Sequence, residues 1–559
     1  MKPSKIISAA VLLLLPAVLL FCSADKLHYP TAQWDGWVLE SVLAIRAGTF
    51  AADPYVIHPP LYLYLLAFFK PLLGADLLAG ARLFNFSCYL LTGWLVFLLS
   101  RRMAGKEHGP AAGFTGAILF YLSPLAFQGT FLLDLGDTAV VPAACALYFY
   151  ALAAGAGGPL KGLPLAAVFA LNLWAKFIHS IFIVFAALAA RFTGAEDEKG
   201  CSNLRIMAAG AALFLLSWTV YAFTSLNAPE RWEPLQYLFG EMIYNYQRQD
   251  VAGGLKQLLY LRITAVARVL LWLWPLLALW ALRLSRRGFG TGTERCMNYF
   301  VLIFMVGAWL SKGTSNGFPK YHAALLPPLC ALCAAWLAGS LPEWRRAAGL
   351  RTAAAAALVL LAAYFAGDPA YTFSHSLKEA LISGSGLHQA LGRLAAQVLA
   401  VPAFFFFLWK VCSGSLEKRS AAVLSLALTG LLWSSAMYVL QARGDYFTNY
   451  GYGTTGKREA VEYVRAHFAK GKAAGANEFA WEFKAAGIPF INVGDRCFIE
   501  AACSAALLRD PGTAFFIFGQ ASNTVEQVKG FLALTPEKLG RPFSSVKKGD
   551  FWIYDFTPR

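Results

Sequence analysis

The sequence predicts a polytopic α-helical membrane protein of about thirteen membrane-spanning helices, with helices at the outer interface and a small C-terminal α/β domain. Three observations predict this fold class. Of the 559 residues, 58% are hydrophobic and only 14% are charged, which is far from the balance of soluble proteins. Hydrophobic runs of about 15 to 22 residues, long enough for membrane-spanning helices, recur along most of the chain. From about residue 441 the chain has the composition of a soluble domain.

The net charge of +16 does not indicate a nucleic-acid-binding protein, because no continuous basic domain carries it. Most positive charge lies in short loops between hydrophobic runs, where lysine and arginine mark the cytoplasmic side. The loops expected inside carry Lys2 and Lys5; Arg101, Arg102 and Lys106; Lys161; Arg191, Lys199 and Arg205; Arg283, Arg286 and Arg287; Arg345, Arg346 and Arg351; Lys410, Lys418 and Arg419. This bias predicts a multi-pass protein of the cytoplasmic membrane, with its N-terminus inside and its C-terminal domain outside.

The first expected span, 6–22, is an uncleaved signal anchor, because the charge pattern downstream needs a crossing there. The second, about 79–100, ends at two arginines that mark the cytoplasmic side. The remaining expected spans are 111–127, 138–155, 162–175, 177–190, 206–225, 262–282, 297–311, 321–339, 352–366, 394–410 and 420–440. A transmembrane domain is therefore expected at 1–440, with two short spans that meet at Lys176.

The outer first loop, residues 24–78, contains an apolar, aromatic run that is too short to cross a bilayer. If this run crossed, the arginines after the second span would lie outside, so we expect the run at the membrane interface. It belongs to the motif formed by His58, Pro59, Pro60 and Tyr62.

Asp35 lies in the same loop between Trp34 and Trp37, and tryptophans prefer the membrane interface. The run 38–47 that follows is amphipathic and would lie flat on the membrane, fixing the height of the acid. A carboxylate held there can orient or deprotonate an acceptor hydroxyl, so Asp35 is the candidate catalytic residue. The alternative is an interfacial acid that only ends a span.

Two further acids, Asp134 and Asp137, lie in a short outer loop between two spans. Their three-residue separation allows both to face one site, where they would bind the acceptor or a metal. The alternative for Asp137 is a cap on the next helix, a common role of aspartate. The sequence establishes no cofactor and leaves a divalent metal open.

Lys176 is the third candidate, because a charged side chain beside hydrophobic spans is costly and usually faces a polar cavity with a partner. The alternative is that it snorkels to the interface. Together with other cations in segments expected outside, Lys176 would form a rim that binds a phosphate group. These other cations are Arg231, Arg248, Lys312 and Lys320.

The tail, 441–559, predicts a small α/β domain outside the cytoplasm. The expected helices are 461–468 and 525–532, and the expected strands are 489–493, 513–518 and 551–554. Cys497 and Cys503 lie in this exported domain and are candidates for a disulfide. Cys330 and Cys333 lie inside a hydrophobic helix without a second pair, which favours core packing over a metal site.

In their order along the chain, these residues resemble the motifs of GT-C glycosyltransferases. The similarity is to the branch that contains protein O-mannosyltransferases and the aminoarabinose transferases that modify lipid A, and it covers about residues 1–340. Its most specific part is the run His58-Pro59-Pro60-Leu61-Tyr62. The others are Asp35, Asp137-Thr138, Ala175-Lys176 and Lys320-Tyr321.

This resemblance implies a polyprenyl-phosphate sugar donor, an inverting displacement at the anomeric carbon and an active site on the outer face. Asp35 would be the acid–base residue, Asp137 a second acid near the acceptor, and Lys176 a contact to the donor phosphate. Members of the family often have two adjacent acids in the first loop, whereas here Gly36 follows Asp35. A two-carboxylate mechanism, and a metal site built on it, are not expected at this position.

We therefore expect an envelope glycosyltransferase with membrane lipid around it and a lipid, glycan or protein acceptor. A transporter or flippase of lipid-linked sugars is the first alternative, since an intramembrane lysine suits a transport pathway. Transporters usually have internal repeats and broken helices at the midplane, and the two halves of this chain show no repeat. A polymerase or ligase of surface polysaccharide is the second alternative, since it would use the same kind of donor.

Overall fold

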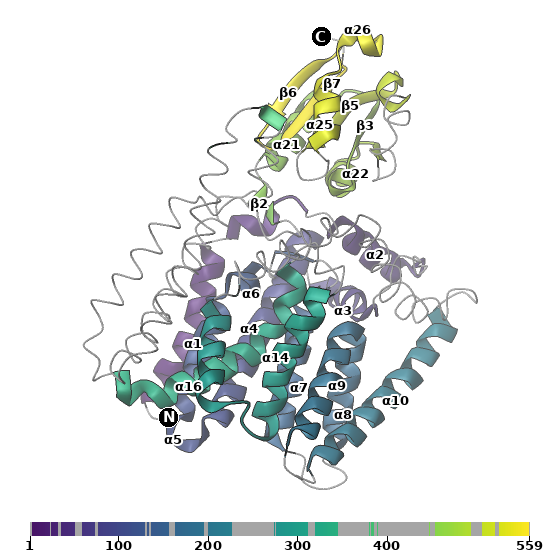
Figure 1. The fold of residues 1–559 in the computed structure, drawn as a ribbon. Coiled ribbons are helices and arrows are strands. Elements are labelled where there is room, and N and C mark those ends of the chain that lie inside the picture. Colours follow the sequence, from purple (N-terminus) through teal and green to yellow (C-terminus); the bar gives the residue numbers. More distant parts are fainter. Residues whose placement is uncertain are drawn as a thin grey trace. The chain divides into compact units, whose positions relative to one another are not determined.

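The computed structural model in Figure 1 shows a mostly helical chain with one mixed sheet. It describes residues 3–22, 24–31, 35–50, 59–72, 76–128, 131–133, 136–155, 162–194, 199–225, 273, 275–310, 319–344, 380, 382–384, 388, 446–447, 453–454, 456–493, 506–519 and 525–557. Two compact units divide the chain. The first is Met1–Cys22, Glu40–Ala354 and Val411–Ser434, and the second is Ser23–Leu39, Ala355–Lys410 and Ser435–Arg559.

The first unit is a helical bundle whose helices follow the hydrophobic runs of the sequence. Its described helices are α1 (Pro3–Phe21), α3 (Leu61–Phe69), α4 (Leu77–Met103), α5 (Gly105–Tyr121), α6 (Pro124–Gln128), α7 (Val140–Ala154), α8 (Gly162–Ala175), α9 (Phe177–Phe192), α10 (Lys199–Ser225), α14 (Gly292–Leu310) and α16 (Leu326–Trp344). The expected span 111–127 is divided, since α5 ends at Tyr121 and α6 begins at Pro124. Helix α3 has nine residues, too few to cross a bilayer, as expected for the first-loop run.

By length and composition, three helices within the described residues can each cross a membrane: Leu77–Met103, Leu204–Ser225 and Lys320–Gly339. The expected spans at 352–366, 394–410 and 420–440 lie outside the described residues, and 262–282 lies partly outside them. The number of thirteen spans therefore stays a prediction, while a helical membrane fold is what the described part of the chain forms.

Helices α4 and α5 pack closely because glycines on each helix meet large side chains or backbone of the other. A Cβ at Gly93 would lie 2.2 Å from the Tyr121 ring, and one at Gly113 would lie 2.8 Å from the Phe97 ring. Helix association in a bilayer relies on such small residues, because lipid provides no hydrophobic drive between helices. Helix α4 also packs against α7 and α16, so it forms the centre of the bundle.

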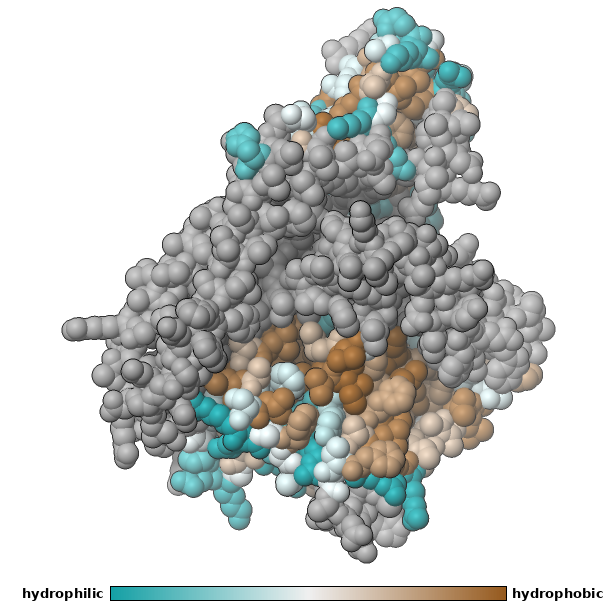
Figure 2. Space-filling view, viewed as in Figure 1, coloured by the Kyte–Doolittle hydropathy of each residue, from teal (hydrophilic) through white to brown (hydrophobic). Residues whose placement is uncertain are grey.

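Large apolar side chains lie exposed on the outer helices of this unit. Figure 2 shows hydrophobic residues gathered over one face of the bundle, with hydrophilic residues below them. On α10 the exposed apolar side chains are Leu213, Leu215, Leu216, Val220 and Phe223. An apolar face this large would be a liability in water but is the surface that lipid covers.

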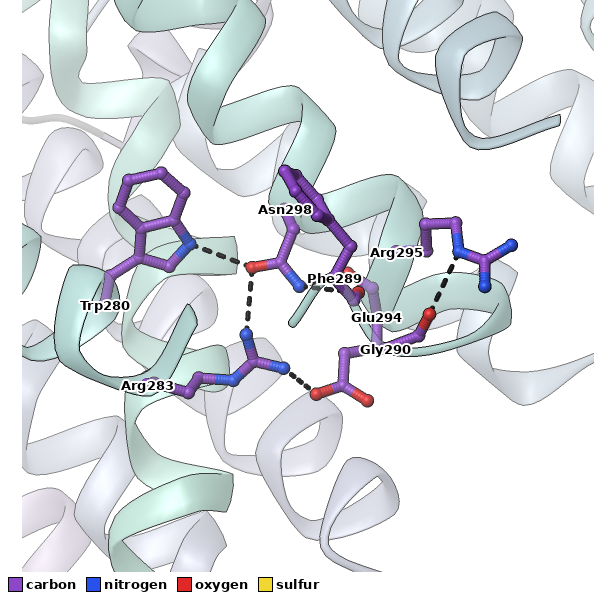
Figure 3. Close-up of polar contacts among 7 residues, drawn as sticks. All are labelled: Trp280, Arg283, Phe289, Gly290, Glu294, Arg295 and Asn298. Atoms are coloured by element: carbon purple, nitrogen blue, oxygen red, sulfur yellow. Dashed lines mark hydrogen bonds and ion pairs between the residues drawn. The ribbon is translucent and has the colours of Figure 1, made fainter. Parts of the chain in front are cut away.

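A polar network joins the helix at 275–287 to the start of α14 (Figure 3). The buried guanidinium of Arg283 donates to Asn298 Oδ1 at 3.0 Å and pairs with Glu294. Trp280 Nε1 donates to the same Asn298 oxygen at 2.8 Å, and Asn298 Nδ2 donates to the Phe289 carbonyl at 2.9 Å. The network therefore satisfies the polar groups of a tight turn between two helices.

The second unit contains a five-stranded mixed sheet in the order β4-β3-β5-β7-β6. Strands β4, β3 and β5 pair in parallel. Strand β7 pairs antiparallel with β5, and β6 pairs antiparallel with β7. The strands are β3 (Lys472–Gly475), β4 (Phe490–Asn492), β5 (Thr513–Gly519), β6 (Ser544–Lys548) and β7 (Phe551–Asp555). The helices are α21 (Lys457–His467), α22 (Ala480–Ala485), α25 (Val525–Leu532) and α26 (Pro536–Leu539), and β1 (Tyr446–Phe447) pairs with β2 (Gly453–Thr454).

The core of this domain lies where α25 covers one face of the sheet. Phe516 and Phe518 of β5 pack on Phe531 of α25, with ring centroids 5.2 and 5.0 Å apart. Tyr554 of β7 donates its hydroxyl hydrogen bond to the Phe531 carbonyl. Burial raises the pKa of Tyr554 to about 12, so the hydroxyl keeps its proton and this bond.

The expected strands and helices of the tail correspond to β4, β5, β7, α21 and α25. The sequence did not predict β3 or β6. Strand β3 reads Lys-Ala-Ala-Gly, all poor strand formers, and its pairing with buried β5 outweighs that preference. Strand β6 carries two lysines at the edge of the sheet, where charge prevents further strand pairing.

We predict that Arg283→Met destabilises the bundle. The change leaves Glu294 without this partner and removes one donor from Asn298. Because the Glu294 side chain is 33% exposed, solvent screens the pair, and the expected cost is about 1–3 kcal/mol. The loss should appear as a lower thermal unfolding temperature of the detergent-solubilised variant than of the wild-type protein. The exposed Arg287→Met is the matched control, and equal transitions for both variants would contradict a role for the network.

Candidate functional site

The first unit has a polar break where two membrane helices meet. Helix α8 ends at Ala175 and α9 begins at Phe177, and Lys176 between them is extended, with φ −168° and ψ 122°. The Lys176 side chain is only 3% exposed and its ammonium forms an ion pair with Asp137. The break was expected from the sequence, and the buried pair excludes the snorkelling alternative.

Asp137 lies in the short segment before α7 and is 2% exposed. Helix α7 begins at Val140, and its N-cap residue, Ala139, makes no side-chain capping bond. The Asp137 carboxylate instead accepts a hydrogen bond from Lys176 Nζ. The structure therefore gives Asp137 a partner across the bundle, at the end of α8.

Residues of α3 and α4 fix the segment that carries Asp137. The Tyr62 hydroxyl donates to Asn85 Oδ1 at 2.8 Å, and Asn85 Nδ2 donates to the Leu132 carbonyl at 2.7 Å. The Tyr62 ring also packs on Gly136, where a Cβ would lie 2.9 Å from it, and Gly136 has φ +74°. Only glycine adopts that conformation and tolerates that contact without strain. Tyr62 of the first-loop motif thus positions the acidic segment.

The segment before α16, η7 (Pro319–Leu325), contributes a lysine and a tyrosine to the same region. Both Lys176 and Lys320 place their ammonium nitrogens 4.8 Å from the Tyr321 ring centroid. His179 Nε2 lies 3.2 Å from the Tyr321 carbonyl oxygen, and its ring stacks on Phe304. Lys320 is 4% exposed, so it is as deeply buried as Lys176.

We call Asp137, Lys176, His179, Lys320 and Tyr321 the buried polar cluster. Its described members contain two ammonium groups and one carboxylate. Buried charges among membrane helices are costly and commonly mark substrate sites. A cluster of this composition suits the phosphate of a lipid.

Asp35 is the first residue of α2 (Asp35–Ala47). It belongs to the second unit, which contains the segment Ser23–Leu39. The helix confirms the helical prediction for 38–47. Asp35 is fully buried, with 0% exposed, and the next residue, Gly36, packs against Trp481 of α22. The carboxylate therefore has a fixed place at a helix start.

Other predicted site residues lie outside the described residues. They are His58, Asp134, Arg231, Arg248, Lys312, Cys497 and Cys503. Pro59 and Pro60 are buried, and Pro60 precedes α3. Among the residues that the structure describes, no three His, Cys, Asp or Glu side chains are grouped to hold a metal ion.

Sequence reasoning missed Arg82 and Asn85. Arg82 and Asn85 lie on α4 and are 2% and 0% exposed, and Arg82 Nε donates to the Phe131 carbonyl at 3.1 Å. The signal was available, because an arginine and an asparagine within an apolar span are expensive unless they have partners. Their role is to hold the segment before Asp137.

Comparison with known proteins gives one family-model match and several similar solved structures. The family model described as dolichyl-phosphate-mannose-protein mannosyltransferase matches residues 57–221. The structure of ArnT from Cupriavidus metallidurans in the apo state is similar, with TM-score 0.59 and 12% identity over 99% of this chain and 98% of ArnT. Its structure bound to undecaprenyl phosphate gives TM-score 0.55 and 15% identity over 100% and 98%. No curated protein matches the sequence.

At these identities the likeness to ArnT shows the fold. The family match covers the stretch that contains Tyr62, Asp137 and Lys176, so it includes the residues that build the polar break. The family match covers less than half of the chain and the likeness to ArnT shows the fold, so the comparisons give a shared fold together with a mannosyltransferase-like stretch at residues 57–221.

Proposed function

We propose that this protein is an inverting glycosyltransferase of the cytoplasmic membrane that transfers a sugar from a polyprenyl-phosphate donor. The acceptor is a lipid, glycan or protein of the envelope, and transfer takes place on the outer face. The similar ArnT structure was determined with undecaprenyl phosphate bound, which supports a donor of this chemical class.

The observation that carries the proposal is the buried polar cluster. The leaving group of the reaction is a lipid phosphate, on which negative charge develops in the transition state. Cations placed in an apolar environment stabilise that charge more strongly than they would in water. Lys176 and Lys320 are two such cations, held on the ring of Tyr321, and we assign them to the donor phosphate.

Asp35 supplies the base in this proposal. The acceptor hydroxyl attacks the anomeric carbon, the bond from that carbon to the phosphate oxygen breaks, and the hydroxyl proton passes to the Asp35 carboxylate. The polyprenyl phosphate leaves with the bonding electrons, and a single displacement inverts the anomeric centre. A base in a fixed position is needed for this proton transfer, and burial at a helix start gives Asp35 such a position.

We predict that Asp35→Asn abolishes transfer. Loss of a positioned base lowers a rate by about 10²- to 10⁴-fold. Mass spectrometry should first identify the envelope lipid, glycan or glycoprotein that a deletion strain loses and the wild-type chain restores. Asp35→Asn should not restore it, at equal protein level. Asp25→Asn, at an exposed aspartate of the same segment, is the control. Full restoration by Asp35→Asn would contradict the base assignment and favour a flippase.

We predict that Lys176→Met lowers both stability and donor affinity, and that a second change separates the two effects. The single variant leaves Asp137 buried without this cation, a loss of about 3–5 kcal/mol for a buried pair. Adding Asp137→Leu removes the stranded carboxylate, so stability should recover. Affinity for undecaprenyl phosphate, measured in nanodiscs, should stay at least tenfold weaker in both variants. Recovery of affinity in the double variant would make the pair purely structural.

The orientation is tested by labelling two exposed positions with a membrane-impermeant thiol reagent. Lys470→Cys, in the C-terminal domain, should react in intact spheroplasts, because that domain is proposed to lie outside. Lys106→Cys, in a loop with positive charge, should react only after permeabilisation. The unmodified chain gives the background of its native cysteines. Reaction at the two positions in the opposite pattern would reverse the proposed topology.

A further inference from the structure

The chain just before Asp35 is bonded to the C-terminal domain. The backbone nitrogen of Thr31 donates to Glu482 Oε1, and the Thr31 hydroxyl donates to the same oxygen at 2.8 Å. Thr31 is 1% exposed and Glu482 is 6% exposed. Both residues belong to the second unit. One carboxylate oxygen of α22 therefore holds the backbone and the side chain of a residue four positions before Asp35.

Lys457 binds the same residue from another side. Its ammonium, fully buried at 0% exposed, donates to the Thr31 carbonyl and to the Glu478 carbonyl at 2.5 Å. It also lies 3.6 Å from Glu482 Oε1. Lys457 is the first residue of α21, where a cation opposes the helix dipole. The buried Lys457 ammonium is unfavourable at a helix start and contacts Thr31, which indicates a role beyond folding of the helix.

The residue just after Asp35 is also in contact with the domain. A Cβ at Gly36 would lie 3.0 Å from Trp481 Cβ, closer than the usual carbon–carbon contact of about 3.5–4.0 Å. Trp481 is the neighbour of Glu482 on α22. The C-terminal domain thus contacts the chain on both sides of Asp35, through adjacent residues of one helix.

We propose that Lys457 and Glu482 are positioning residues of the transfer reaction, which hold Thr31 and thereby set the place of the Asp35 carboxylate. The inference rests on the proposed function, because it takes Asp35 as the base. It assigns the C-terminal domain a part in catalysis. A displacement of the reacting group by about 1 Å can cost about 10²-fold in rate, and two bonded contacts next to Asp35 restrict such a displacement.

The same contacts give a physical reason for Gly36, where related enzymes often have a second acid. A carboxylate at this position would need its Cβ within the space of Trp481. Close packing of α22 against the residue after Asp35 therefore makes a side chain at this position unfavourable unless Trp481 shifts by a few tenths of an ångström.

The test measures rate and binding separately in the full-length protein. Lys457→Met should lower the rate of product formation at least tenfold, while its Kd for undecaprenyl phosphate stays within about threefold of wild type. Lys470→Met, the same change at an exposed lysine of the domain, should alter neither. If the Lys457→Met protein, with the substitution verified, forms product at the wild-type rate, the proposal is overturned.

Thr31→Val keeps the domain's own residues intact, so it decides the matter if Lys457→Met fails to fold. It removes the hydroxyl that donates to Glu482 and keeps the side-chain shape. We expect a rate about fivefold lower in the wild-type background and no further loss when Thr31→Val is added to Glu482→Leu, since both changes break the same bond. If the double variant instead loses rate by the product of the two single-variant losses, the proposal is overturned.

These outcomes separate the inference from the proposed function. If Asp35→Asn abolishes transfer while Thr31→Val and Lys457→Met retain the full rate, only the positioning role is wrong. If Asp35→Asn retains the full rate, the base assignment is wrong, and the inference that depends on it is overturned as well. A fall in undecaprenyl phosphate binding equal to the fall in rate would also overturn positioning, because it would indicate a damaged protein or a donor contact.

Discussion

The cost of placing a charge in an apolar interior is the constraint on which the rest of this structure depends. Lys176 and Lys457 are both almost fully buried, and each is next to a carboxylate, Asp137 in the first unit and Glu482 in the second. Such pairs contribute little net stability, because desolvation offsets most of the attraction, and apolar replacements often do as well. Their presence is therefore better explained by what the charges do than by folding.

The helical part of the fold could be predicted because the hydrophobic runs that form the helices, and their lengths, are visible in short stretches of the sequence. The helix ends at Ala175 and Ala154 fall where the hydrophobic runs end, and the break at Lys176 follows from one charge between two apolar runs. The strand β3 could not be predicted in this way. Its residues have low strand propensity, and only its neighbours β4 and β5, which come later in the chain, make it a strand.

The candidate site was predicted as a set of residues but not as an arrangement. Asp137 and Lys176 were assigned to the acceptor and the donor separately, whereas the structure joins them as one pair. A pairing across 39 positions leaves no periodic trace, since it depends on how α7 meets the end of α8. The contact of Thr31 with Glu482, 451 positions apart, is still less accessible to a reading of local patterns. Motifs therefore supplied the candidate residues, and packing determined their partners.

The glycine that follows Asp35 has a consequence for charge balance in the proposed reaction. Trp481 packs closely beside Gly36, where a Cβ would lie 3.0 Å from the Trp481 Cβ, so this position favours glycine over a second carboxylate. Negative charge there is limited to the one group that must accept a proton. In the proposed reaction the departing phosphate depends on positive charge from the protein, and the two lysines of the buried polar cluster are assigned that role. The proposed base and the proposed phosphate contacts therefore answer two separate electrostatic needs of one displacement, a proton acceptor for the nucleophile and positive charge for the leaving group.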